Sequence, residues 1–182
     1  MMYTLTKNYR RANVWIDEAP PADFAASSVV KRIVTPKRAS ISLHRIAAVE
    51  IFQPMGPMIG YALLGGELIQ SDVDGLEVVV LVNADGAQFN SPLVPNSDEA
   101  WVGLDDEYVD WVFSGVEKVN ESDGLPTGAS LRFRWAAHGW NGSSRMLFKR
   151  LSGLVVQLLM LPKNPSEAEI ADLIDKSRQT SW

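Results

Sequence analysis

The chain has 182 residues, of which 46% are hydrophobic and 21% charged, a composition typical of a globular protein large enough to bury its own core. It contains no cysteine, which excludes disulfides, thiol catalysis and cysteine-ligated metal centres. Its longest apolar segments, which begin at Leu76 and Leu151, are much shorter than the roughly 20 residues that cross a bilayer. The first residues also lack the apolar stretch of a signal peptide, so we expect a cytoplasmic protein without a membrane partner.

The net charge of −5 is distributed unevenly along the chain. Residues 1–50 carry eight Lys and Arg against four Asp and Glu, residues 51–128 carry one against fourteen, and residues 129–182 again carry eight against four. Five cations of the last block follow one another without an intervening acid: Arg132, Arg134, Arg145, Lys149 and Arg150. Clustered cations can neutralise phosphates. The alternative is that this basic region pairs with the acidic middle of the same molecule.

The first half of the chain predicts irregular structure followed by short strands. Pro20-Pro21 favours an irregular start, with a short helix over 24–33, and the β-branched segment 40–52 predicts one long strand or two short ones. Proline and glycine make 53–60 a loop. Gly65-Gly66 predicts a tight turn between two short strands.

The next segment has the clearest pattern. Residues 76–83 are a β-branched run of strand length, and Asp85-Gly86 favours a hairpin turn into a second strand over 87–94. A helix is expected to begin at Asp105 or Asp106, because either carboxylate can cap free backbone N–H groups. Its apolar residues recur at helical spacing and are Tyr108, Val109, Val112, Phe113 and Val116.

The last third predicts a strand and two helices. Residues 129–137 alternate, with Leu131, Phe133 and Trp135 on one face and the arginines 132 and 134 on the other. The segment 138–142 breaks this strand, and Ser143 or Ser144 caps the following helix, which Pro162 ends. Ser166 and Glu169 form a capping box that opens a final short helix.

Two motifs within this pattern resemble the fourth domain of elongation factor G. Glu107-Tyr108-Val109, followed by Val112 and Gly115-Val116, resembles that domain's first helix. Ser143-Ser144-Arg145-Met146-Leu147-Phe148-Lys149 resembles its second helix, which opens with two serines. The resemblance covers residues 76–160, about half of the chain.

The resemblance implies an α+β fold of the ribosomal protein S5 domain 2-like type, a β-sheet with two helices packed on one face. We therefore divide the chain into a β-rich N-terminal segment (1–72), a domain IV-like unit (73–162) and a C-terminal helix (163–182). In the family, the loops at the tip of this domain reach the decoding region of the ribosome, and residues 138–142 correspond to one of them. The chain has no GxxxxGK[ST] phosphate loop, so it lacks the family's GTPase motif.

The loop after the Trp135 strand carries the candidate binding residues. It joins a strand to a helix N-terminus, where backbone N–H groups favour an anion. The alternative is that its serines only cap the helix. The full candidate set is Arg132, Arg134, His138, Trp140, Asn141, Ser143, Ser144, Arg145 and Lys149.

Catalysis and metal binding have less support. A serine nucleophile would need a base held by a third group, and the chain has only His44 and His138 and no G-x-S-x-G elbow. Three acids that could ligate a metal are more typical of a solvated helix face: Asp105, Asp106 and Asp110. We therefore name no catalytic residue, no metal site and no cofactor.

The primary hypothesis is a non-enzymatic binding module that contacts RNA, the ribosome or an acidic partner through its basic strand, loop and helix. A second hypothesis is a small-molecule-binding protein or enzyme with a pocket between the N-terminal segment and the domain IV-like half. A third is a homodimer through an exposed sheet edge. Trp101 and Trp140 are further candidates, either as exposed platforms for a ligand or as buried plugs.

Overall fold

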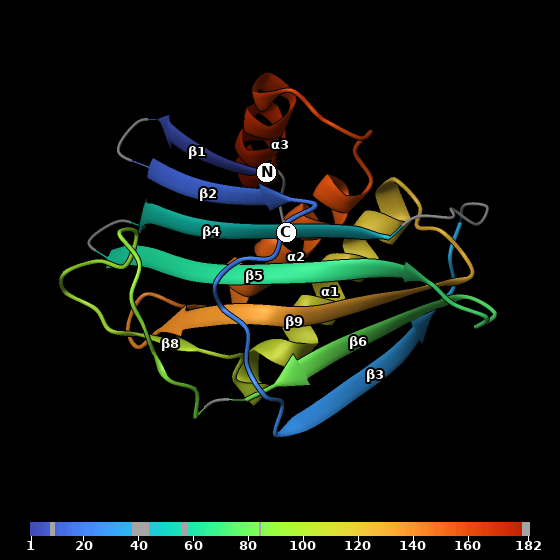
Figure 1. Cartoon of the computed structure of the whole chain (residues 1–182), viewed down its shortest axis with the longest axis horizontal. Helices are drawn as coiled ribbons and strands as arrows, with labels where there is room; N and C mark the ends of the chain where they lie inside the picture. Colours follow the sequence, from blue (N-terminus) through green and yellow to red (C-terminus); the bar gives the residue numbers. More distant parts are fainter. Residues whose placement is uncertain (8–9, 38–43, 56–57, 84, 180–182) are drawn as a thin grey trace.

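The computed structural model describes residues 1–7, 10–37, 44–55, 58–83 and 85–179 (Figure 1). The helices are α1 (Asp106–Ser122), α2 (Arg145–Leu159) and α3 (Glu167–Gln179). The strands are β1 (Met2–Lys7), β2 (Arg10–Ile16), β3 (Ser28–Val34), β4 (Arg45–Met55), β5 (Met58–Gln70), β6 (Leu76–Val82), β7 (Gln88–Phe89), β8 (Ala100–Val102) and β9 (Ala129–Gly139). The chain is therefore of the α+β class, as predicted.

The strands of the described residues form one sheet in the order β1-β2-β4-β5-β9-β6-β3, with β8 attached to the end of β9 and β7 to β8. Neighbouring strands are antiparallel except β6 and β9, which run parallel. In Figure 1 the helices lie behind the sheet. Strands β6 and β9 both run from right to left in this view, and β9 lies above β6. The connection through α1 is therefore left-handed, whereas about 98% of such connections are right-handed.

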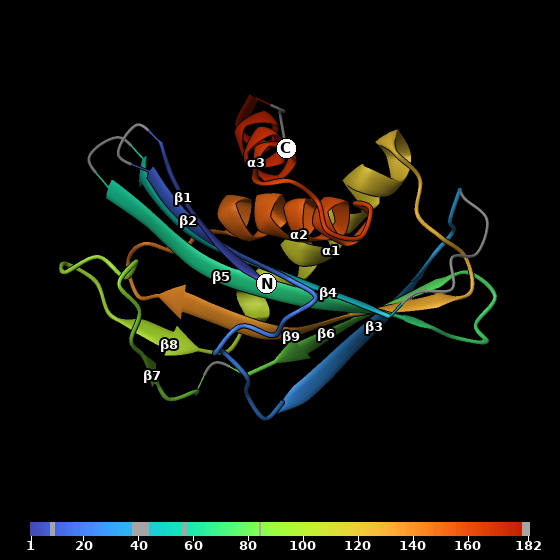
Figure 2. The ribbon, with the colours of Figure 1, turned by 45° about the horizontal axis from the view of Figure 1, so that its top comes forward.

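All three helices lie on one face of the sheet (Figure 2). Helix α2 packs on β4 and β5, α1 packs on α2 and β6, and α3 packs on α2. Between helices and sheet lies the main core, whose largest fully buried side chains include Phe113, Phe133, Phe148 and Leu151. We refer to the other side of the sheet as the open face.

Part of the open face carries a second, smaller core. Trp15, Ala48, Tyr61, Leu63 and Trp135 project from the sheet on this side. They are covered by residues from two connecting segments, Ala22 from the first and Phe89 and Leu93 from the second. On the β3, β6 and β9 side of the open face, charged residues such as Lys31 and Arg132 lie among apolar ones such as Val29, and this side carries the candidate surface described below.

The predicted helix starts are confirmed. Asp105 caps α1 by accepting a hydrogen bond from the Glu107 N–H (3.0 Å), and Ser144 caps α2 by accepting from the Leu147 N–H (3.2 Å). At α3, the Ser166 N–H donates to Glu169 Oε2 (2.7 Å) and the Glu169 N–H donates to Ser166 Oγ (3.3 Å). The polar residues at these positions were enough to predict where the helices begin, because a cap depends only on residues close in sequence.

The predictions of irregular structure and of a helix within residues 1–35 were wrong. The segment predicted as irregular contains β1, β2 and β3, and the helix expected over 24–33 is replaced by β3. Strand β3 pairs antiparallel with β6 along its whole length. Its β-branched residues, Val29, Val30, Ile33 and Val34, favour an extended backbone once a partner strand is available.

Of two turns predicted in the middle of the chain, the one over 53–60 was too long, since β4 and β5 are antiparallel with Met55 opposite Met58, and the one at Gly65-Gly66 was wrong. Residues 53–55 and 58–60 lie in β4 and β5, with Pro54 opposite Ile59, while 56–57 are outside the described residues. Gly65-Gly66 lies inside β5. A Cβ on Gly65 would lie 2.8 Å from Ala48 Cβ and 3.2 Å from Trp135 Cβ, so this glycine is explained by close packing rather than by a turn. The strand predicted over 40–52 is confirmed from Arg45 onward, and 40–43 lie outside the described residues.

The hairpin predicted after residue 83 does not form. Strand β6 is confirmed at Leu76–Val82, but its neighbours are β3 and β9. Of the second predicted strand only Gln88–Phe89 is extended, and it pairs with β8. The parallel pairing of β6 with β9 takes the edge that the hairpin would have used.

Trp135 lies on the opposite face of the sheet from Leu131 and Phe133, whereas the alternation predicted one face for all three. The register between β5 and β9 pairs Gly65 with Trp135 and Gly66 with Phe133, so Arg134 is an extra residue in a β-bulge. The bulge places Phe133 in the main core and Trp135 in the second core. Simple alternation of side chains therefore fails at this one position.

Candidate functional site

The loop after β9 already holds an anion, the carboxylate of Asp98. Asp98 Oδ1 accepts hydrogen bonds from the Asn141 N–H (2.9 Å) and the Glu99 N–H (2.9 Å), and Oδ2 accepts from the Gly142 N–H (2.8 Å). A Cβ on Gly139 would lie 2.3 Å from Asp98 Oδ2. The backbone N–H groups predicted to face an external phosphate are thus occupied by a side chain of the same chain.

The loop serines have structural partners. Ser143 Oγ donates to the Tyr61 carbonyl (2.7 Å) and accepts from the Gly139 N–H (2.8 Å), while Ser144 caps α2. The imidazole of His138 lies 3.0 Å from the Gly103 carbonyl through Nδ1, and its ring is tilted against Tyr108. These contacts support the capping alternative for Ser144, whereas Ser143 ties the loop to β5 and β9 and does not cap the helix.

Asp98→Ala is therefore expected to lower the free energy of unfolding by about 1–3 kcal/mol, because it removes three hydrogen bonds to a charged group. The matched control is Glu99→Ala, because Glu99 is an exposed neighbour on the same loop and should change stability by less than about 0.5 kcal/mol. Equilibrium urea unfolding measures both. Equal effects of the two substitutions would contradict the role given to Asp98.

The predicted cations do not form one surface. Arg145 and Lys149 belong to α2, where Arg145 pairs with Glu107 of α1 (3.3 Å) and the Lys149 ammonium lies 5.9 Å from the Trp111 ring centre. Arg150 is buried and donates to Gln53. The helical cations thus lie in the helix layer, whereas Arg132 and Arg134 lie on the open face.

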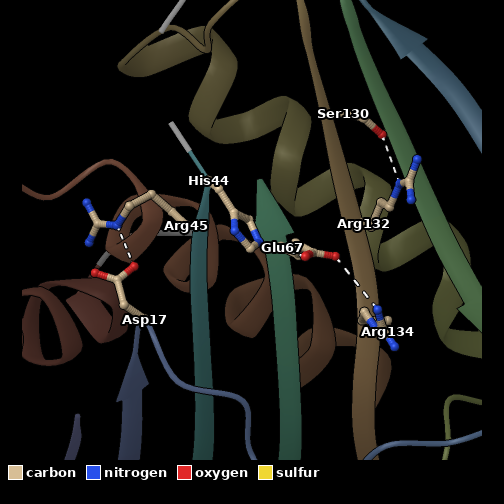
Figure 3. Close-up of polar contacts among 7 residues, drawn as sticks. All are labelled: Asp17, His44, Arg45, Glu67, Ser130, Arg132 and Arg134. Carbon is tan, nitrogen blue, oxygen red and sulfur yellow. Dashed lines mark hydrogen bonds and ion pairs between the residues drawn. The ribbon is translucent and has the colours of Figure 1, made fainter. Parts of the chain in front are cut away.

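Arg132 and Arg134 occupy the centre of the open face, together with residues that sequence reasoning did not connect to them (Figure 3). Arg134 pairs with Asp23 (3.5 Å) and Glu67 (3.8 Å), and Glu67 Oε1 also accepts a hydrogen bond from His44 Nε2 (2.8 Å). Arg132 Nε donates to Ser130 Oγ (3.4 Å). Within the described residues, Arg132 forms no ion pair.

The register places a second cation in line with Arg132. Arg132 lies opposite Val79 of β6, and Val79 lies opposite Lys31 of β3. Two strand spacings separate the two cations, about 10 Å at their Cα atoms. Lys31 is paired only loosely, at 3.5 Å from Glu77. Lys31, Arg132 and Arg134, which we call the sheet cations, are therefore the part of the predicted basic surface that lies together.

A buried carboxylate on the same face was not anticipated. Glu50 is 2% exposed and accepts hydrogen bonds from Asn13 Nδ2 (2.8 Å) and the Tyr61 hydroxyl (2.9 Å). Its position in register with Asn13 on β2 is the signal that could have found it, since a buried acid needs donors on neighbouring strands. The network ties three strands of the open face together.

The Tyr61 phenol gives the network a pH dependence. Burial, reinforced by the Glu50 carboxylate, raises the pKa of Tyr61 far above its usual value of about 10. Below that value both folded and unfolded chains keep the proton, whereas above it the unfolded chain loses the proton first, so the free energy of unfolding should fall as the pH rises beyond about 10. In urea unfolding at a series of alkaline pH values, Tyr61→Phe should show a shallower fall than the natural chain. An unchanged slope would contradict the assignment.

The structure also offers cavities. One of about 220 Å³ lies between the β1–β2 end of the sheet and α3, and its lining includes Leu5, Arg10, Arg11, Ile51 and Ile174. Its lining residues come from the N-terminal segment and the C-terminal helix. The second hypothesis expected a pocket between the N-terminal segment and residues 73–162 instead. Another, of about 440 Å³, is lined by both Trp101 and Trp140.

No metal centre is found in the part of the chain that the structure describes, since no three His, Asp or Glu residues there are grouped to hold an ion. Of the acids considered as ligands, Asp105 is a helix cap and Asp110 pairs with Arg32. Among the described residues, none of the helices combines the length and apolar character needed to cross a bilayer.

Comparison with protein-family models finds no match to this chain, and comparison with curated protein sequences finds none either. The functional argument therefore depends on the geometry of the site.

Proposed function

We propose that the chain is a binding module that holds an acidic protein segment on the open face of its sheet, along the edge strand β3. The observation that carries this proposal is Arg132, a cation on an exposed sheet face without an ion pair among the described residues, in register with Lys31. Charges arranged in this way recognise a partner by complementary charge.

Strand β3 supplies the second part of the surface. It ends the strand order, so its outer edge pairs with no strand of the described residues. Val29 and Ile33 are 50% and 59% exposed and flank Lys31 on the open face. An extended segment can add to such an edge by main-chain hydrogen bonds, while alternate side chains provide specificity. A partner with alternating apolar and acidic residues fits this edge.

An acidic protein segment fits the surface better than RNA does. Arg134 is already paired with Asp23 and Glu67, and Lys31 with Glu77, so few cations remain to release counterions from a phosphate backbone. The sequence pI of about 5.0 also opposes nonspecific binding of nucleic acid. Exposed pairs such as Lys31–Glu77 contribute at most about 1 kcal/mol, so a carboxylate of the partner can replace Glu77.

The experiment uses a fluorescent peptide of alternating valine and glutamate, seven residues long to match β3. We expect fluorescence anisotropy to report binding, and Arg132→Glu to weaken it about tenfold, equivalent to about 1.4 kcal/mol. Arg145→Glu is the matched control, because Arg145 lies in the helix layer. Equal losses in both variants, or no binding of the acidic peptide, would reject the proposal.

A labelled ribosomal RNA fragment forms the second arm of this experiment. Binding that is tight at low salt, falls steeply with added salt and depends on Arg145 and Lys149 would favour the alternative, contact with RNA through the basic strand, loop and helix. If added salt weakens binding of the peptide less than binding of the RNA, the result favours the proposal that the open face binds an acidic protein segment.

We also propose that residues 73–162 share the ribosomal protein S5 domain 2-like fold of elongation factor G domain IV. The order β6, α1, β9 and α2, with both helices on one face of the sheet, supports this proposal. Competition with elongation factor G for isolated ribosomes tests its functional side: displacement of the factor by an excess of this chain is expected if the resemblance extends to the binding surface.

A further inference from the structure

Two tryptophans line an open pocket of about 440 Å³ at one end of the sheet. Trp101 lies on β8, and Trp140 directly follows β9 with 79% of its surface exposed. The remaining lining residues are short and polar or acidic: Asn96, Ser97, Asp98, Glu99 and Asn141. The pocket thus combines aromatic rings with carboxylates.

The walls of this pocket are tied together through the backbone. The Trp140 N–H donates to the Glu99 carbonyl (2.8 Å), and the Asn141 N–H donates to Asp98 Oδ1 (2.9 Å). Trp101 is paired with His138 across β8 and β9. Because these contacts hold the walls of the pocket in place, little ordering is required when a ligand binds.

The charge of the pocket favours a cation. Asp98 and Glu99 contribute two carboxylates, and none of the pocket's lining residues is Lys, Arg or His. The neighbouring pocket, which shares Asn96, Asp98 and Glu99, is also lined without a cation. An anion would be repelled here, whereas the carboxylates attract a cation, and tryptophan is the aromatic side chain that attracts cations most strongly.

The hydrogen-bonding state of Asp98 narrows the class of cation. Its two oxygens already accept from three backbone N–H groups, so Asp98 offers a ligand negative charge more than free hydrogen-bond acceptors. A quaternary ammonium donates no strong hydrogen bond and needs only negative charge and ring faces. We propose that the Trp101–Trp140 pocket binds a quaternary or fully methylated ammonium group.

Choline and its neutral carbon isostere, 3,3-dimethylbutan-1-ol, test this proposal, because they share a shape and differ in charge. In isothermal titration calorimetry we expect choline to bind and the isostere to bind at least about tenfold more weakly. A peptide carrying trimethyl-lysine distinguishes the source of the group: tighter binding of the peptide indicates a modified protein, and equal or weaker binding indicates a free small molecule.

Variants locate the site. Trp140→Ala removes an exposed ring and should weaken choline binding about tenfold without unfolding the chain, while Glu99→Gln should weaken it by a smaller factor. Trp111→Phe is the matched control, because Trp111 lies on α1 and contacts Lys149 instead. Equal affinities for choline and its isostere, failure of both choline and the trimethyl-lysine peptide to bind, or unchanged affinity in Trp140→Ala would each overturn the proposal.

Discussion

Gly115→Ala is expected to destabilise the chain by about 3 kcal/mol or more, although alanine in a helix is otherwise favoured over glycine by about 1 kcal/mol. Gly115 lies on α1 where this helix crosses α2. A Cβ there would lie 2.0 Å from Ser152 Oγ and 2.1 Å from the Lys149 carbonyl oxygen. Because the second neighbour is backbone, the two helices must separate, and the core beneath them must lose contacts.

Gly66→Ala makes the same chemical change in a softer environment. Its Cβ would lie 3.1 Å from Val155 Cγ1 and 3.5 Å from Leu131 Cδ1, both of which are ends of side chains that can shift. Equilibrium urea unfolding should therefore show a much smaller loss for Gly66→Ala than for Gly115→Ala. Similar losses would mean that the helix crossing is looser than the structure indicates.

Arg45→Met is expected to lower the free energy of unfolding by about 1.5–3 kcal/mol, the range for hydrogen bonds of a charged group, because Asp17, the partner left behind, is 43% exposed. Arg45 is 2% exposed, and Figure 3 shows its guanidinium directed at Asp17. Its Nε donates to Asp17 Oδ1 (2.7 Å) and its Nη1 donates to the Leu161 carbonyl (2.7 Å), so one side chain ties the end of β2 to the end of α2. Methionine keeps most of the volume and removes both bonds.

Two substitutions calibrate that result. Lys176→Met removes a pair with Asp172 whose side chains are 68% and 58% exposed, and should cost less than about 1 kcal/mol. Arg45→Lys keeps the charge but cannot reproduce the two-armed geometry, so it should restore only part of the stability. Thermal and urea unfolding measure all three, and a loss for Arg45→Met no larger than that for Lys176→Met would contradict the structural role.

The sequence predicted the parts of the fold that depend on neighbouring residues. The caps Asp105, Ser144 and Ser166 follow from local hydrogen bonds. The α+β class and strands β6 and β9 follow from periodicity. Strand β3 and the pairing of β6 with β9 could not be predicted in the same way, because long-range pairing decided them.

The candidate site shows the same division. The basic composition of the strand, loop and helix could be read from the sequence. The face on which each cation lies could not, because it depends on the bulge at Arg134 and on the packing of α2 in the helix layer. Asp98 lies more than forty residues before the loop that it fills, and nothing in the loop's own residues indicated it. A contact between residues so far apart in sequence can be identified only once the fold is known.

Backbone amide chemical-shift mapping with the alternating valine–glutamate peptide tests the central proposal most directly. We predict that added peptide shifts the amide resonances of β3 and of Arg132 on β9, and leaves those of Arg145 and Lys149 unchanged. Shifts confined to residues 138–149, with β3 unaffected, would contradict the open-face surface and return the binding site to the loop and helix.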